Sequence, residues 1–182
     1  IDIREYKLDS LRKAIGMVLQ KSILFSGTIR DNLKWGNEHL SDNKMIEACK
    51  TACAHDFIIS FPEQYDTVLG QGGVNLSGGQ KQRLSIARTL IKEPKILILD
   101  DSTSAVDMET EAKIQNALKQ IKGCTIIIIA QRITSVMNAD KIIVLEDGEI
   151  VAEGNHEELL KNSPIYQDIY HSQIREGDII ND

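Results

Sequence analysis

The residues most suited to chemistry form one short run, Leu76, Ser77, Gly78, Gly79 and Gln80. Serine followed three residues later by glutamine is the pattern of a capping box, so the run predicts a helix that begins after Ser77. The two glycines leave backbone amides open to close approach, and the positive end of the helix dipole attracts anions. The run therefore indicates an anion site. The simpler interpretation is a capped helix with a solvated basic face.

Two aspartates directly follow an apolar run and form a second polar group. Ile96–Leu99 has no alternation of polar residues and ends in Asp100 and Asp101. A carboxylate at the carboxyl end of a buried parallel strand is well placed to hold Mg²⁺ bound to phosphates. The alternative is a surface aspartate that merely ends the strand. Further on, Asp107 could cap the helix that begins at Met108.

The elements that position these residues are those of a layered α/β fold. Unbroken apolar runs favour strands that are buried on both faces of a parallel sheet, and there are three, Ile96–Leu99, Ile126–Ile129 and Ile142–Leu145. An amphipathic helix between the first two, Met108–Ile121, and a helix between Arg132 and Asn138 give repeated βα units.

The flanking regions differ from this core. Residues 28–94 have helical periodicity and few strand signals, which indicates a helical insertion. Near the end we expect a strand at Glu149–Ala152 and a helix capped by Asn155. A last helix should begin at Pro164 and carry Ile165 and Ile169 inward.

Composition excludes several classes of protein. The formal net charge of -6 over 182 residues argues against a nucleic-acid partner, because such proteins usually need a basic face. The longest apolar run, Thr125–Ala130, is far shorter than the roughly 20 residues that cross a bilayer. Cys49 and Cys53 could be metal ligands, but with Met45 they form the apolar stripe of a helix, so core packing is favoured.

The run Leu76–Gln80, with Lys81–Arg83 after it, resembles the signature motif of ATP-binding cassette proteins. The resemblance implies a RecA-like P-loop NTPase core with a mainly parallel sheet, an inserted helical subdomain, and the cofactors ATP and Mg²⁺. It also implies that two such domains pair head to tail, with the signature residues and the loop at Asp107 acting on the partner's ATP. The strand ending in Asp100 resembles the Walker B element, and Gln20 resembles the glutamine of the Q-loop, which reaches the metal or the attacking water.

Two of the positions that would normally run hydrolysis depart from the family pattern. Asp101 stands where the family usually has a glutamate that polarises water, and Gln131 stands where it usually has a histidine. Aspartate is shorter by about 1.5 Å, and a misplacement of about 1 Å can lower a rate roughly a hundredfold. An amide cannot carry the charge of an imidazolium. We therefore expect slow hydrolysis at this chain's own site, as in the degenerate subunit of heterodimeric bacterial exporters.

Leu24–Leu33 resembles the exporter-type cassettes, whose helical subdomain meets the coupling helices of the transmembrane domains. The resemblance implies a domain at the cytoplasmic face of a membrane, paired with a second, non-identical nucleotide-binding domain. We divide the chain into a core segment at 1–20, a helical subdomain at 21–93, a second core segment at 94–155 and C-terminal helices at 156–182. The alternatives are a non-catalytic pairing or regulatory cassette and a soluble ABC ATPase.

A phosphate-binding loop of the form GxxxxGK[ST] is missing from the 182 residues. We therefore expect the chain to be an excerpt that begins after this Walker A loop and that has little ATPase activity alone. We also expect a strand beside the Asp100 strand to be lacking, which would leave these residues weakly stable or prone to aggregate.

Overall fold

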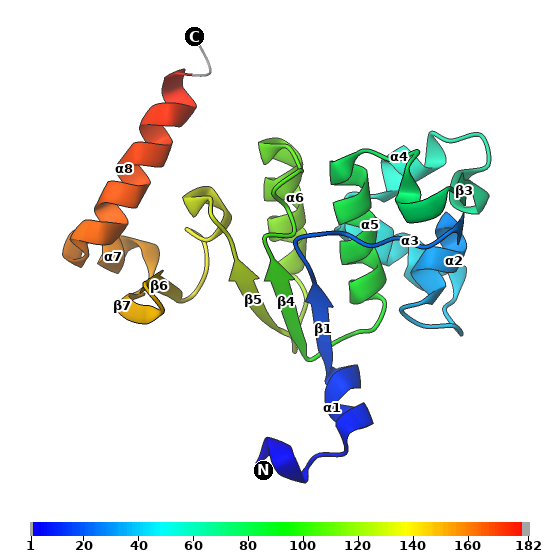
Figure 1. Ribbon diagram of the computed structural model, residues 1–182, viewed down its shortest axis with the longest axis horizontal. Helices are drawn as coiled ribbons and strands as arrows, with labels where there is room; N and C mark the ends of the chain where they lie inside the picture. The colour runs from blue at the N-terminus through cyan, green and yellow to red at the C-terminus, as the bar shows by residue number, and fades with distance from the viewer. Residues whose placement is uncertain (1, 180–182) are drawn as a thin grey trace. The chain divides into compact units, whose positions relative to one another are not determined.

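The computed structural model describes residues 2–179, with side chains as far as residue 174. It consists of two compact units, Ile1–Ile129 and Ala130–Asp182, each with its own hydrophobic core. The first unit contains a parallel sheet and most of the helices, and the second contains a hairpin and two helices (Figure 1).

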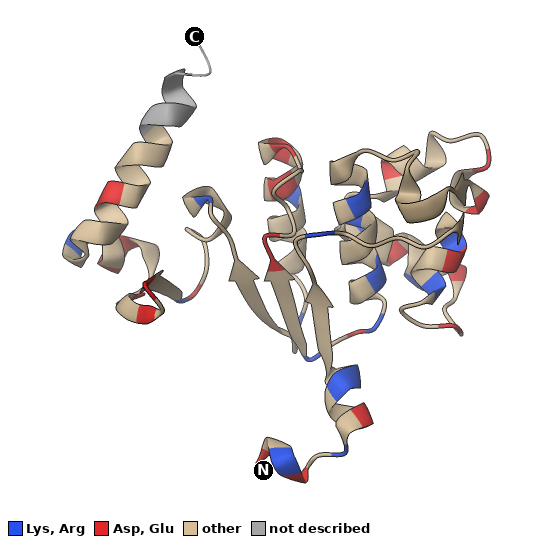
Figure 2. Cartoon of the chain, viewed as in Figure 1, with Lys and Arg blue, Asp and Glu red and all other residues tan. Residues whose placement is uncertain are grey.

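The sheet of the first unit has three parallel strands in the order β1-β4-β5, namely Ile15–Val18, Ile96–Asp100 and Thr125–Ile129. These strands contain no lysine or arginine, and their one acidic residue is Asp100 at the end of β4 (Figure 2). Leu97 and Leu99 of β4 are buried. The strands expected at 96–99 and 126–129 and the α/β class are thereby confirmed.

β4 lies between β1 and β5, so the expectation that a strand beside it would be lacking is wrong. Within the described residues the two edge strands of this sheet are β1 and β5. Ile127 and Ile129 of β5 are about half exposed, although their apolar side chains suit burial. The apolar run of β5 therefore offers more hydrophobic surface than the first unit covers.

A helical insertion separates β1 from β4, as the periodicity predicts. Its four α-helices are α2 (Ile29–Lys34), α3 (Asp42–Thr51), α4 (His55–Ile59) and α5 (Gly78–Leu90). A two-stranded antiparallel ladder of β2 (Gly27–Thr28) and β3 (Val68–Leu69) supports the first of them. Before β1 the chain forms α1 (Leu8–Ala14), and α6 (Met108–Leu118) connects β4 to β5.

Cys49 of α3 belongs to the core, whereas Cys53 lies after the end of the helix with a φ of 51° and is only partly buried against the core. Met45, Cys49 and Ala52 are all buried, which confirms the packing role expected for them. Burial raises the pKa of the Cys49 thiol to about 12, so the thiol stays protonated at neutral pH. Among residues 2–179, no group of three histidine, cysteine or acidic side chains could hold a metal ion.

The second unit differs from expectation in three places. β6 (Ile142–Glu146) forms an antiparallel hairpin with β7 (Glu149–Gly154), and Ile143 and Leu145 are exposed rather than buried. In place of the helix expected between residues 132 and 138, only one 3-10 turn forms, Ile133–Ser135. A single short turn cannot carry the i to i+4 ladder of an α-helix.

Two helices follow the hairpin, α7 (His156–Asn162) and α8 (Pro164–Ile179). Asn155 caps α7 with a complete capping box, as predicted. The prediction that Ile165 and Ile169 of α8 point inward is wrong, because both are partly exposed and Tyr166 is buried instead. The Tyr166 hydroxyl lies 2.7 Å from a ring nitrogen of His156, so the tyrosine satisfies its polar end while its ring fills the core.

Candidate functional site

The carboxyl edge of the sheet brings three of the predicted residues together. Gln20 follows β1, Asp100 is the last residue of β4, and Asp101 directly follows it; β4 runs parallel to β1. The Gln20 side-chain amide donates a 3.1 Å hydrogen bond to a carboxylate oxygen of Asp101, 81 residues further along the chain. Residues predicted separately from two strands thus form one polar group at one edge of the sheet.

The backbone of Asp101 fixes where its carboxylate lies. Its φ of 43° is in the left-handed region, and its N–H donates to the carbonyl of Ile129 on β5 at 2.8 Å. Aspartate is among the non-glycine residues that adopt this conformation most readily, because its short polar side chain can form local hydrogen bonds. The chain therefore turns sharply out of β4 at the residue that carries the second carboxylate.

Asp100 and Gln20 are the residues at this edge that could hold a cation. Within residues 2–179, the Asp100 carboxylate makes no hydrogen bond, and neither does the side-chain oxygen of Gln20. Mg²⁺ is usually bound by one or two carboxylates together with waters and phosphate oxygens rather than by a full protein cage. This donor set fits Mg²⁺ delivered with a phosphate ligand and does not fit a resident structural metal.

The signature run has the predicted local structure. Ser77 is the N-cap of α5: its hydroxyl accepts from the Gln80 N–H at 3.2 Å, and the Gln80 side chain accepts from the Ser77 N–H at 2.9 Å. Ser77 and Gly78 are exposed at the start of the helix, whereas Leu76 is buried and anchors the turn. A free helix N-terminus with a hydroxyl and two glycines can approach an anion closely.

The loop that follows Asp101 lies against this first turn. A Cβ on Gly79 would lie 2.7 Å from the carbonyl oxygen of Ala105, and one on Gly78 would lie 3.3 Å from the Ala105 Cβ. Asp107 at the end of the loop caps α6 by accepting from the Thr110 N–H at 2.9 Å, and this hydrogen bond lowers the pKa of Asp107. The capping role foreseen for Asp107 is confirmed.

Gln82 and Ser104, which take part in this contact, were not predicted as site residues. Gln82 of α5 is buried and hydrogen-bonds to Ser104 and to the backbone of Ala105. A buried amide side chain normally has partners, so a glutamine on the inner face of α5 is the signal that could have identified the contact. Sequence alone does not say which loop supplies those partners.

Gln131 belongs to the second unit. Its carbonyl accepts from the Gln173 side chain at 2.9 Å, and the same side chain accepts from the Ile133 N–H at 2.7 Å. The segment that carries Gln131 is thereby tied to α8. In the described structure Gln131 is thus held by its own unit, whereas Gln20, Asp100 and Asp101 form the group in the first.

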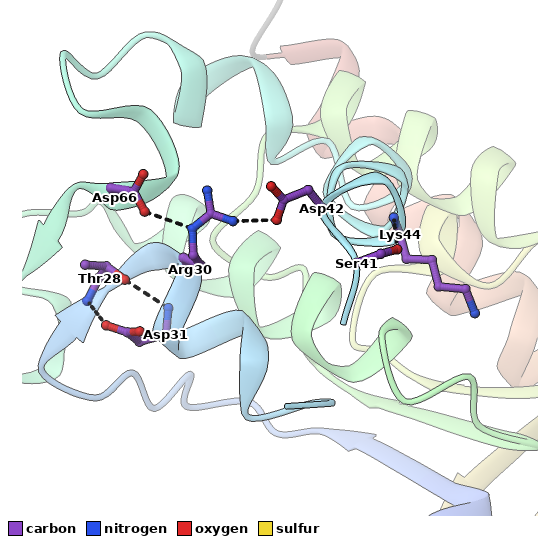
Figure 3. A network of polar contacts seen from close by, with 7 residues as sticks. All are labelled: Thr28, Arg30, Asp31, Ser41, Asp42, Lys44 and Asp66. Atoms are coloured by element: carbon purple, nitrogen blue, oxygen red, sulfur yellow. Dashed lines mark hydrogen bonds and ion pairs between the residues drawn. The ribbon is translucent and has the colours of Figure 1, made fainter. Parts of the chain in front are cut away.

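The segment expected to meet transmembrane domains is built around α2. Thr28 and Asp31 form a capping box at its start, and Arg30 bonds to Asp66 at 2.8 Å and to Asp42 at 2.6 Å, which ties the helix to two other parts of the insertion (Figure 3). Phe25 stacks on Trp35 with ring centroids 4.8 Å apart. Both rings remain substantially exposed, so they form an apolar surface beside a well-anchored helix.

Comparison with known proteins gives consistent relatives. A family model described as ABC transporter matches residues 1–104. An uncharacterized ABC transporter ATP-binding protein, YfiB of Bacillus subtilis (strain 168), is 53% identical over 176 residues, which is 96% of this chain and 30% of that protein. An ATP-dependent lipid A-core flippase of Syntrophus aciditrophicus (strain SB) is 48% identical over 179 residues, covering 98% of this chain and 30% of the flippase.

Solved structures show the same likeness. The structure of a bacterial Atm1-family ABC exporter with ATP bound matches with a TM-score of 0.90 and 40% identity, over 95% of this chain and 31% of that one. The chain thus spans about 30% of the length of the curated relatives it matches. A search of the described residues finds no helix with the length and apolar character that a membrane span requires.

Proposed function

The chain belongs to the ABC transporter family, and from this premise we propose that it works as most of the nucleotide-binding domain of an exporter. It would pair head to tail with a second such domain, and ATP with Mg²⁺ would bind between the two. One observation carries the proposal: a capped, glycine-containing helix start and a carboxylate-lined sheet edge stand in the same unit. In a pair, the first would complete the partner's site and the second the chain's own.

The residues at each surface have separate tasks in this proposal. Ser77, Gly78 and Gly79 would donate to the γ-phosphate of the ATP held by the partner, since α5 begins there with open amides and a hydroxyl. Asp100 would hold Mg²⁺ through water, and Gln20 would contact the ion or the attacking water. Bound Mg²⁺ supplies charge that neutralises the phosphate oxygens during transfer.

We further propose that the chain's own site hydrolyses ATP slowly and that its partner is a non-identical subunit with a competent site. The support is the residue types Asp101 and Gln131, together with the hydrogen bond that Gln20 makes to Asp101. That bond occupies one acceptor site of the carboxylate and fixes its orientation toward Gln20. A general base must lie within hydrogen-bond reach of the proton it removes, so the position of the carboxylate is the first requirement and its pKa the second.

The second partner would be the transmembrane domains of the same transporter, which would place these residues at the cytoplasmic face of the membrane. The support is the pair of exposed, stacked rings of Phe25 and Trp35, which flank α2, and the ion pairs by which Arg30 holds that helix in place. Aromatic side chains that are exposed yet rigidly stacked are typical of interaction surfaces. Two relatives carry the words exporter and flippase in their names, which favours export.

The experiment compares two N-cap serines in the assembled transporter. Ser77→Ala removes the cap of α5 and a phosphate donor, whereas Ser41→Ala removes the cap of α3, which plays no part in the proposed site. Loss of one preorganised donor lowers turnover on the order of a hundredfold, so Ser77→Ala should abolish most ATPase activity and Ser41→Ala should not. Asp101→Glu should raise turnover at the chain's own site by far less than Ser77→Ala lowers it.

The result also separates the competing functions. Equal ATPase activity in the Ser77→Ala variant and its parent would overturn the assignment of the signature surface. Absence of turnover in the parent pair, with pairing intact, would instead support a non-catalytic pairing cassette. Full activity of the domain pair without any membrane segment would favour a soluble ABC ATPase.

A further inference from the structure

One buried side chain connects the two polar surfaces of the first unit. Gln82 lies on the first turns of α5 and is 4% exposed. Its Nε2 donates to the Ser104 hydroxyl at 3.2 Å, and its Oε1 accepts from the Ala105 N–H at 2.9 Å. Both ends of its amide are therefore bound to the loop that leaves Asp101, and Gln82 itself is buried.

The connection continues to the carboxylate edge. The Ser104 hydroxyl donates to the carbonyl oxygen of Asp101 at 2.9 Å, and the Asp101 carboxylate is the one that accepts from Gln20. A hydroxyl that accepts one hydrogen bond and donates another transmits orientation from its donor to its acceptor. Movement of Gln82 would thus alter the residue at which the chain turns out of β4.

Close packing supports the same connection. The Ala105 carbonyl oxygen lies so near Gly79 that no Cβ fits between them, and Gly78 packs on the Ala105 side chain. Packed interiors shift between discrete arrangements and do not deform continuously. The first turn of α5 and the loop at Ser104 and Ala105 should therefore move as one body.

We propose that Gln82 is a positioning residue that couples the two nucleotide sites of the assembled pair. This rests on the proposed function, in which the start of α5 serves the partner's ATP and Asp101 serves the chain's own. Through Gln82, occupancy of one site biases the geometry of the other inside a single chain. Coupling of this kind is a free energy shared by both sites, so it acts in both directions.

The test uses the full-length transporter with both nucleotide-binding domains present. Gln82→Met keeps the side-chain length and removes both hydrogen bonds, while Ser104→Ala removes the link to Asp101. Each variant should lower cooperativity between the sites, seen as a Hill coefficient for ATP near 1, and lower kcat by about fivefold or more with KM changed much less. The effects should not add in the double variant, since both interrupt one path.

A matched control lies on the same helix. Thr89 is also buried on α5 and hydrogen-bonds within the helix, to the carbonyl of Ser85, without touching the loop. Thr89→Val should leave the Hill coefficient unchanged, which a merely structural role for buried polar groups on α5 would not predict. Gln82→Glu keeps the acceptor for Ala105 and should fall between Gln82→Met and the parent.

The possible outcomes are distinguishable. If Ser77→Ala abolishes turnover but Gln82→Met and Ser104→Ala retain the parent's Hill coefficient and kcat, the coupling is overturned and the proposed function stands. If Ser77→Ala has no effect, the proposed function falls whatever Gln82 does. Should Gln82→Met fail to assemble, Ser104→Ala decides the question by the same readout.

Discussion

Replacing Asn32 by alanine should loosen the segment that links the Gln20 edge to α2. Asn32 is 2% exposed, and it accepts from the Phe25 N–H at 2.8 Å. Its amide donates to the carbonyl oxygens of Phe25 at 2.9 Å and of Thr28 at 3.0 Å. Alanine would leave one N–H and two carbonyl groups without these partners. The turn that carries Phe25 to α2 would lose its anchor.

The magnitude follows from those three groups. Leaving a buried polar group unsatisfied costs about 1–3 kcal/mol, and the groups here are only partly buried, so we expect a total of roughly 2–4 kcal/mol. If the loss opens the segment locally, the Phe25 amide should exchange its hydrogen about 30-fold to 1,000-fold faster. Mass-detected hydrogen exchange of the peptide spanning residues 22–34 in the full-length protein measures this directly.

Asn32→Asp is a sharper test because it keeps the shape of the side chain and replaces the NH2 donor by an oxygen acceptor. The carboxylate can still accept from Phe25, but its second oxygen would face two carbonyl oxygens, so the loss at neutral pH should exceed that of alanine. Burial raises the pKa of such a carboxyl, and the protonated form can donate one bond. The excess destabilisation should therefore disappear as pH falls through the raised pKa.

The matched control is Asn37→Asp, because Asn37 is exposed and its side chain accepts from the His39 N–H. It should exchange like the parent at residues 22–34. Parent-like exchange in Asn32→Ala would show that Asn32 does not anchor the segment. Equal behaviour of Asn32→Asp and Asn32→Ala at all pH values would contradict the electrostatic part of the reasoning.

Three further outcomes can be checked. Gly79→Ala should lower stability by about 1–3 kcal/mol in thermal unfolding, since its Cβ would lie 2.7 Å from the Ala105 carbonyl, and an unchanged melting temperature would refute the close contact. The ionised Asp107 carboxylate stabilises the fold above its unfolded pKa of about 3.9, and this stabilisation is lost as pH falls through the lowered pKa of the folded state. The stability of Asp107→Asn, measured by circular dichroism, should therefore fall less in acid than that of the parent. Iodoacetamide at pH 8 should modify partly exposed Cys124 before buried Cys49, and equal rates would contradict the burial of Cys49.

Features set by local interactions could be predicted from the sequence. The capping boxes at Ser77 and Asn155 formed as expected, because cap and partner lie three residues apart and need no tertiary contact. The strand at Ile96–Asp100 was also predictable, since an uninterrupted apolar run of that length favours a strand in a parallel sheet covered by helices.

Features that depend on distant partners could not be predicted from the sequence. The run Ile142–Leu145 has the same composition as a central strand, yet it pairs with β7, because a two-residue turn at Asp147 and Gly148 lets the chain return at once. On α8, periodicity alone ranks isoleucine as inward, but the side that is buried is the one on which Tyr166 forms a hydrogen bond with His156. The Gln82 contact likewise joins residues more than 20 positions apart.

Asp101 shows how the structure changes the meaning of a sequence departure. From the sequence alone, Asp101 differs from the family's glutamate only by a side chain that is shorter by about 1.5 Å, so Asp101→Glu would be expected to restore a general base. In the structure its φ is 43°, a conformation that aspartate tolerates better than longer side chains, and its carboxylate meets Gln20 at 3.1 Å. A longer side chain would have to displace that amide. We therefore expect Asp101→Glu alone to recover little hydrolysis, and recovery of a competent rate by this single change, measured as single-turnover cleavage at the chain's own site, would show that the hydrogen bond to Gln20 places no constraint on the base.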